Sequence, residues 1–245
     1  MTSTNITPSA ARRVSAWSVH ALTASGALWG LLAVLCIARS EFREALIFMI
    51  VAIAVDSVDG MLARWVRVKE TMPWFDGALL DNLVDYLNYV FVPAVFIHEA
   101  QLLPPSLALL SSIVLCVASA YQFCQIDAKT DDHFFLGFPS YWNVVSFYLF
   151  LGGLDPRVNL AIIWFFVVMV FVPLKWAYPS RMGHFRAVTV LATALWGGTC
   201  IAMIVQYPTA PPWLLPASLV YVCYYVGLSL ILGRMATSAA HSSAS

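Results

Sequence analysis

The sequence contains few charged residues. Only 11% of its 245 residues are Asp, Glu, Lys or Arg, whereas 61% are hydrophobic. Soluble domains carry about 25% charged residues, so this composition indicates a membrane protein. The 13 basic and 13 acidic residues also cancel. Without a net positive field, we expect no nucleic-acid partner.

Paired cysteines are lacking too. The five cysteines stand singly inside apolar runs, with no C-x-x-C pair: Cys36, Cys116, Cys124, Cys200 and Cys223. This pattern is typical neither of a disulfide framework nor of a zinc site. We interpret them as packing residues.

Long apolar runs make up most of the sequence. A helix needs about 20 apolar residues to cross a bilayer, and eight runs approach that length: 17–38, 45–66, 77–97, 103–124, 139–153, 158–174, 186–206 and 212–232. We therefore predict an all-α, polytopic bundle of about eight transmembrane helices. It comprises a cytoplasmic segment (1–16), one transmembrane domain (17–232) and a disordered tail (233–245). The first run is longer than a typical signal-peptide core, so we expect an uncleaved anchor.

Basic residues are distributed unequally between the two sides of these spans. The amino-terminal side collects Arg12, Arg13, Arg64, Arg67, Lys69, Lys129, Lys175, Arg181, Arg186 and Arg234, and the other side has only Arg39, Arg43 and Arg157. Cytoplasmic loops carry the excess of Lys and Arg. We predict that both termini lie in the cytoplasm.

Four aspartates interrupt two neighbouring apolar spans. Asp56 and Asp59 lie in 45–66, and Asp81 and Asp85 lie in 77–97. A carboxylate at such a depth costs roughly 3 kcal/mol unless it is paired, hydrated or bound to metal. At about 100° per residue, each pair shares one helix face.

The four carboxylates are expected to converge. Asp59 and Asp81 are each 11 residues from Glu70, so an antiparallel hairpin centred there brings the two pairs to one depth. A purely structural role would require a Lys or Arg beside the aspartates at the same depth. Neither span has a basic residue in such a position. Divalent cations would relieve the repulsion, and a cluster of four oxygen ligands can hold two Mg²⁺ or Mn²⁺ ions.

The residues around the aspartates resemble a family signature, D-x-x-D-G-x-x-A-R, a spacer, then G-x-x-x-D-x-x-x-D. It reads here as Asp56, Asp59, Gly60, Ala63, Arg64, Gly77, Asp81 and Asp85. The signature is similar to that of the CDP-alcohol phosphotransferase family. The resemblance implies a dinuclear site in a homodimer.

The resemblance also implies residue roles. Asp56, Asp59 and Asp81 would bind metal, and Asp85 would touch metal and act as general base on the acceptor hydroxyl. Asp56 and the positions Gly60, Ala63 and Gly77 would line the nucleotide pocket. Arg64, near the expected cytoplasmic mouth, is placed to meet a diphosphate. Thr23 is a further candidate for the nucleotide, and His20 beside it is either a second one or a structural residue.

The spacer departs from most of the family. Twelve residues, Trp65 to Asp76, separate Arg64 from Gly77. This length is similar to that of the bacterial branch that joins choline to CDP-diacylglycerol and releases CMP. The resemblance implies a protein of the bacterial inner membrane with its active site open to the cytoplasm. The segments 137–143, 171–175 and 179–181 resemble the same branch, although relatives that use serine share part of the last two. Serine, inositol and glycerol phosphate remain alternative acceptors.

Choline binding would require aromatic faces, because quaternary ammonium groups bind over them. Candidates for choline or the lipid phosphate are Tyr121, Tyr141, Trp142, Lys175 and Arg181. An ordinary interfacial aromatic belt and topogenic charge explain the same residues. A cation-coupled transporter is the alternative from another class, because intramembrane carboxylates also mark ion pathways. It does not explain the fixed glycines and arginine.

Overall fold

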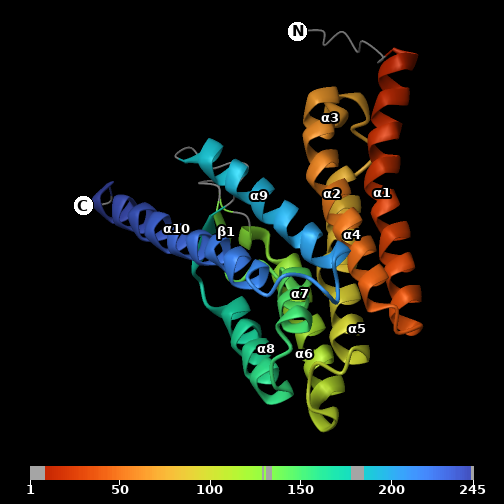
Figure 1. Ribbon diagram of the computed structural model, residues 1–245. Helices are drawn as coiled ribbons and strands as arrows, with labels where there is room; N and C mark the ends of the chain where they lie inside the picture. Colours follow the sequence, from red (N-terminus) through yellow and green to blue (C-terminus); the bar gives the residue numbers. More distant parts are fainter. Residues whose placement is uncertain (1–8, 129, 131–133, 178–184, 244–245) are drawn as a thin grey trace.

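The computed structural model describes residues 9–128, 130, 134–177 and 185–243, and it is all-α as predicted. Its elements, in chain order, are α1 (Ala10–Ala38), α2 (Phe42–Val66), α3 (Val68–Thr71), α4 (Gly77–Tyr86), η1 (Leu87–Phe91), α5 (Val92–Glu99), α6 (Pro105–Cys124), η2 (Ile126–Ala128), β1 (Phe134–Leu136), α7 (Trp142–Gly152), α8 (Pro156–Phe171), β2 (Lys175–Ala177), α9 (Arg186–Val205) and α10 (Leu214–Ser243). Figure 1 shows α1 and α2 side by side, with α9 and α10 crossing the bundle obliquely.

Six helical runs in the described residues are long and apolar enough to cross a membrane. They are α1, α2, the continuous run Gly77–Glu99, α6, α9 and Leu214–Met235 of α10. The predicted spans 139–153 and 158–174 correspond to α7 and α8, whose 11 and 16 residues fall short of the usual length. The protein is therefore an integral membrane protein, while the predicted number of eight crossings and the orientation of the termini stay predictions.

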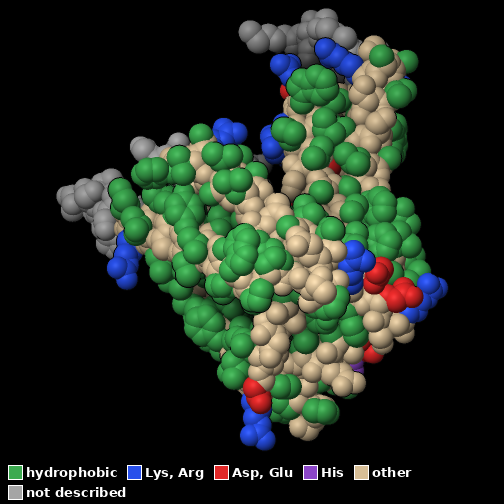
Figure 2. All heavy atoms as spheres, viewed as in Figure 1, with side chains coloured by type: hydrophobic (Ala, Val, Ile, Leu, Met, Phe, Trp, Pro, Cys, Tyr) green, Lys and Arg blue, Asp and Glu red, His purple; other side chains and the backbone are tan. Residues whose placement is uncertain are grey.

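The outer surface of the bundle supports this assignment. Leu191, Leu195 and Val220 on α9 and α10 are each more than 60% exposed. Figure 2 shows hydrophobic side chains covering much of the face formed by α8, α9 and α10. Such a large apolar surface matches lipid contact and would be a liability in water.

Small residues allow the first helix to approach the third span closely. A Cβ added at Gly30 would lie 2.6 Å from Oδ1 of Asn88, and one added at Gly26 would collide with Val84. Nδ2 of Asn88 donates a 3.0 Å hydrogen bond to the carbonyl oxygen of Gly26. Small residues four apart are a common basis of tight helix packing in membranes. This contact fixes α1 against the helix that carries Asp81 and Asp85.

The twelve-residue spacer folds as a cover over α1. Arg67 adopts a left-handed conformation that ends α2 and precedes the short helix α3. Val68 and Met72 then pack in a buried cluster with Ala16 and Val19 of α1. The spacer thus connects α2 to α4 and buries apolar surface of α1.

The helix that carries Asp81 and Asp85 has a defined start and an irregular middle. Oδ1 of Asp76 accepts hydrogen bonds from the amides of Ala78 and Leu79, which caps the start of α4. After Tyr86 the chain forms the π-helical turn η1, where the amide of Val92 donates to the carbonyl of Leu87. Pro93 follows and has no amide hydrogen to offer the carbonyl of Tyr89 four residues earlier. Such turns are often found at functional sites.

The second half of the chain packs around its own core. Trp142 is fully buried in a cluster with Leu115 and Ile163 from α6 and α8, and its Nε1 donates a 2.7 Å hydrogen bond to Oγ of Ser119. The strands β1 and β2 pair antiparallel, with Phe135 opposite Trp176. Arg43 of α2 donates hydrogen bonds to the carbonyl oxygens of Ile204 and Val205. These bonds attach the end of α9 to α2.

The first and last helices extend past the predicted transmembrane segment 17–232. Helix α1 begins at Ala10, within the segment 1–16. Helix α10 continues to Ser243, through most of the segment 233–245 that the sequence predicts to be disordered.

Candidate active site

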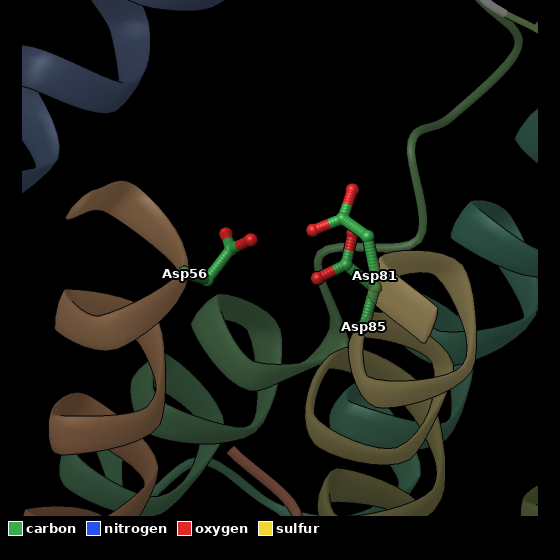
Figure 3. Close-up of side chains that lie close together, drawn as sticks. All are labelled: Asp56, Asp81 and Asp85. Carbon is green, nitrogen blue, oxygen red and sulfur yellow. The ribbon is translucent and has the colours of Figure 1, made fainter. Parts of the chain in front are cut away.

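Three of the predicted carboxylates converge. Asp56 on α2 faces Asp81 and Asp85 on α4, and carboxylate oxygens of the three lie within 4.8 Å of one another. Figure 3 shows the side chain of Asp56 pointing across to the other two from the opposite helix. The helical hairpin expected from the sequence therefore brings residues from two spans to one depth. We call these three residues the acidic centre.

A tyrosine connects the two helices at this centre. The hydroxyl of Tyr89 donates a 2.6 Å hydrogen bond to Oδ2 of Asp56. Tyr89 follows Asp81 and Asp85 at successive four-residue steps, so all three side chains occupy one helix face. The hydrogen bond restrains the Asp56 carboxylate from the side of η1.

Asp59 lies close to the centre but deeper in the protein. It is only 3% exposed, and it lines a small pocket together with the acidic centre, Tyr89 and Thr23. It does not belong to the group of three whose oxygens converge. The wall that Thr23 and Gly26 contribute comes from α1, so the pocket is enclosed by three spans.

The donor set of the acidic centre suits a hard divalent cation. All converging atoms are carboxylate oxygens, the ligands that Mg²⁺ and Mn²⁺ prefer over nitrogen or sulfur. The repulsion among three carboxylates at this spacing also makes a bound cation favourable. Asp56, Asp81 and Asp85 therefore fit a metal site, and Asp59 is near enough to extend it.

The arginine of the signature lies along the same helix. Arg64 is exposed, and a Cβ added at Gly60 would lie 3.5 Å from its Nη1. The guanidinium therefore runs back over Gly60, one turn closer to the acidic centre. The absence of a side chain at Gly60 leaves this position open for a group that both the arginine and the backbone can contact.

Two other signature positions are packed against α1. Ala63 contacts the buried cluster formed by α1 and α3. A Cβ added at Gly77 would be 2.6 Å from Cε1 of His20, so the start of α4 approaches α1 closely there. Nε2 of His20 is buried without a hydrogen-bond partner. In this structure the small size of Gly77 is explained by helix packing.

The residues predicted for choline or lipid phosphate are not grouped together. Tyr121 is 50% exposed and its ring packs on Phe171, and Trp142 is completely buried in the core. Nζ of Lys175 lies 5.4 Å from the ring centroid of Phe134. Arg181 lies outside the described residues. Of the four that the structure describes, Tyr141 borders the large cavity described next.

A cavity of about 600 Å³ adjoins the acidic centre, and we call it the aromatic chamber. Its aromatic lining residues are Tyr89, Phe138, Tyr141, Tyr148, Phe166, Trp176, Trp196, Tyr221 and Tyr225. Tyr89 lines both this chamber and the small acidic pocket. The acidic pocket and the aromatic chamber are therefore adjacent at Tyr89.

Trp176 faces the chamber from β2. Neighbouring residues of a strand point to opposite sides, so Lys175 points away from the chamber.

Sequence reasoning missed Tyr89 and Tyr225. The spacing of Asp81, Asp85 and Tyr89 by four residues was a usable signal for Tyr89, because it predicts a shared helix face. Gly26 and Gly30 were also missed, although their four-residue spacing is typical of close helix packing. No local pattern indicates Tyr225, which meets Trp176 only when β2 packs on α10. Their rings are nearly parallel, with centroids 6.3 Å apart.

The fold and the site define a polytopic α-helical membrane protein with a carboxylate cluster between its first spans. No family model matches the chain. The chain is similar to phosphatidylcholine synthases of Legionella pneumophila (41% identity, covering 88% of this chain and 87% of that protein), Pseudomonas aeruginosa (38%, 92% and 95%) and Legionella bozemanae (38%, 82% and 95%). The chain belongs to the phosphatidylcholine synthase family.

Proposed function

We propose that this chain transfers the phosphatidyl group of CDP-diacylglycerol to choline and releases CMP. The observation that carries this proposal is the convergence of Asp56, Asp81 and Asp85 from two spans, in a chain similar over most of its length to phosphatidylcholine synthases. Phosphoryl transfer between two oxygens requires charge stabilisation at the phosphates and a base for the acceptor hydroxyl.

In the proposed reaction, the hydroxyl oxygen of choline forms a bond to the phosphorus that carries diacylglycerol. The bond between that phosphorus and the oxygen of the CMP phosphate breaks, and CMP leaves with the bonding electrons. Asp85 takes the proton of the hydroxyl. Arg64, exposed over Gly60, is available for the diphosphate. Tyr89 holds the Asp56 carboxylate in a fixed orientation.

Metal binding is part of the proposal. Asp56, Asp81 and Asp85 would hold Mn²⁺ or Mg²⁺, with Asp59 completing a site for two ions. The bound cations would neutralise charge on the diphosphate and on the leaving CMP. The nucleotide would lie toward Gly60 and Thr23. We further propose that the site opens to the cytoplasm of a bacterial inner membrane and that the protein is a homodimer, both from the basic-residue distribution and the family resemblance.

An acceptor panel tests the proposal. Purified protein in mixed micelles is supplied with CDP-diacylglycerol, Mn²⁺ and either choline, serine, inositol or glycerol phosphate, and CMP release is measured. We expect CMP release with choline and little with the others. Asp56→Asn is the matched negative control. Efficient release with another acceptor would redirect the assignment to that alcohol, and cation uptake into vesicles without any CMP release would instead support a transporter.

A further inference from the structure

We propose that the aromatic chamber is the acceptor pocket, in which the trimethylammonium group of choline is held by the rings of Tyr89, Tyr141, Trp176 and Tyr225. This inference rests on the proposed function and adds to it the residues that select the acceptor. They come from η1, the turn before α7, β2 and α10, so four parts of the chain would form one binding surface.

The chamber is in the right place for an acceptor. Tyr89 forms part of its wall and donates a hydrogen bond to Asp56. Asp85, the proposed base, is one helical turn before Tyr89. Choline is short, so a bound ammonium group must lie near the base that receives the hydroxyl proton. A pocket that shares a wall with the acidic centre meets this requirement.

The chemistry of the walls favours an organic cation. Centroids of Tyr89 and Tyr141 are 6.1 Å apart, and those of Phe138 and Trp176 are 6.2 Å apart, so neighbouring rings form aromatic parts of the wall. A cation that lies against these ring faces gains cation–π attraction. Among the described residues, no charged side chain lines the chamber. An acceptor with a carboxylate or phosphate would lack a basic partner there, whereas a cation gains from the rings and the nearby aspartates.

Two buried donors in residues that line the chamber are available to a ligand with an oxygen atom. Nδ2 of Asn143 and Nε1 of Trp176 are buried without a hydrogen-bond partner, and both residues line the chamber. Asn143 is only 3% exposed. Buried donors without partners are costly. The hydroxyl oxygen of choline can accept one such bond, and its ammonium group requires none.

The rings beside the acidic centre define the proposed position of choline. Tyr141 directly precedes α7, and its ring centroid is 6.1 Å from that of Tyr89. Leu149, more than two turns later on α7, also lines the chamber, roughly 12 Å along the axis. The chamber is therefore longer than an ammonium group requires, and we assign choline to the part beside Tyr89.

The test compares choline with its neutral carbon isostere, 3,3-dimethylbutan-1-ol, in the full-length protein. For Trp176→Leu and Tyr225→Leu, we expect kcat/KM for choline to fall about tenfold and that for the isostere to change by less than about threefold. The KM for CDP-diacylglycerol should stay constant. Trp176→Tyr keeps an aromatic ring and should restore most of the preference. Trp213→Leu, at a position 65% exposed outside the chamber, is the matched control.

The outcomes separate the inference from the proposed function. Equal losses for choline and the isostere would overturn the cation pocket, as would an unchanged preference in both leucine variants. If the leucine variants changed only how the rate depends on the acyl chain length of CDP-diacylglycerol, the chamber would be assigned to an acyl chain. That result would also overturn the cation pocket. If the unmodified protein releases no CMP with choline, the proposed function itself fails. A selective loss for choline supports the inference.

Discussion

The hydroxyl of Tyr89 and the carboxylate of Asp56 form a 2.6 Å hydrogen bond between η1 and α2. The bond joins the two spans that carry the acidic centre, and it does so within the π-helical turn that follows Asp85. Tyr89 is therefore a positioning residue. It fixes one metal-ligand candidate while forming a wall of the chamber.

Removing this hydroxyl should slow the reaction. We expect Tyr89→Phe to lower kcat by about tenfold to a hundredfold, because hydrogen bonds to charged groups contribute about 1.5–3 kcal/mol. The KM for choline should change little, since the ring stays. Tyr86→Phe removes a comparable bond, from that hydroxyl to the carbonyl of Cys116, away from the centre. The rate of CMP release is measured for both variants. Similar rates for Tyr89→Phe and Tyr86→Phe would refute the positioning role.

The base assignment predicts a difference among the aspartates. Asp85→Asn should lower kcat by about a hundredfold or more, because general-base catalysis contributes about 10²–10⁴-fold. The Mn²⁺ affinity should fall less than it does in Asp56→Asn. Asp155→Asn, which preserves the cap of α8, is the control and should be active. Full turnover by Asp85→Asn together with an inactive Asp56→Asn would leave a metal site but exclude Asp85 as the base.

Divalent cations should stabilise the folded protein as well as activate it. At about a hundred times its Kd, a bound ion adds about 2.7 kcal/mol to stability. Mn²⁺ should therefore raise the Tm of the unmodified protein in detergent, and chelation should reverse the shift and stop CMP release. Asp81→Asn should lose most of this shift, while Asp155→Asn keeps it. An identical shift in Asp81→Asn would argue against the acidic centre as the binding site.

The close approach of α1 to η1 predicts a stability effect. Gly30→Val should destabilise the protein by about 1–3 kcal/mol, because the added carbon atoms meet Asn88 in a packed interface. Thermal unfolding in detergent provides the measurement. The same change at Gly197 of α9, where an added Cβ has no neighbour within 4 Å, is the matched control. Equal melting temperatures for the two variants would contradict tight packing at Gly30.

Much of the fold follows from the sequence because helices in a bilayer are specified locally. The length of each apolar run predicts a helix long enough to span a bilayer, and such helices are present as α1, α2, α6, α9, α10 and the run Gly77–Glu99. The facing positions of Asp56 and of Asp81 and Asp85 were also predictable, since helical periodicity and a hairpin connection determine them. The pairing of the strands β1 and β2 was not.

Other features depend on contacts between distant segments. The sequence by itself determined a membrane bundle with acidic side chains on two adjacent spans. Only the tertiary structure decided that Asp59 is buried beside the group of three, that Gly77 packs on His20, and that Trp176 of β2 and Tyr225 of α10 border one chamber. Hydrophobicity and helical periodicity act over neighbouring residues, whereas a cavity forms only where helices from separate parts of the chain fail to fill the space between them.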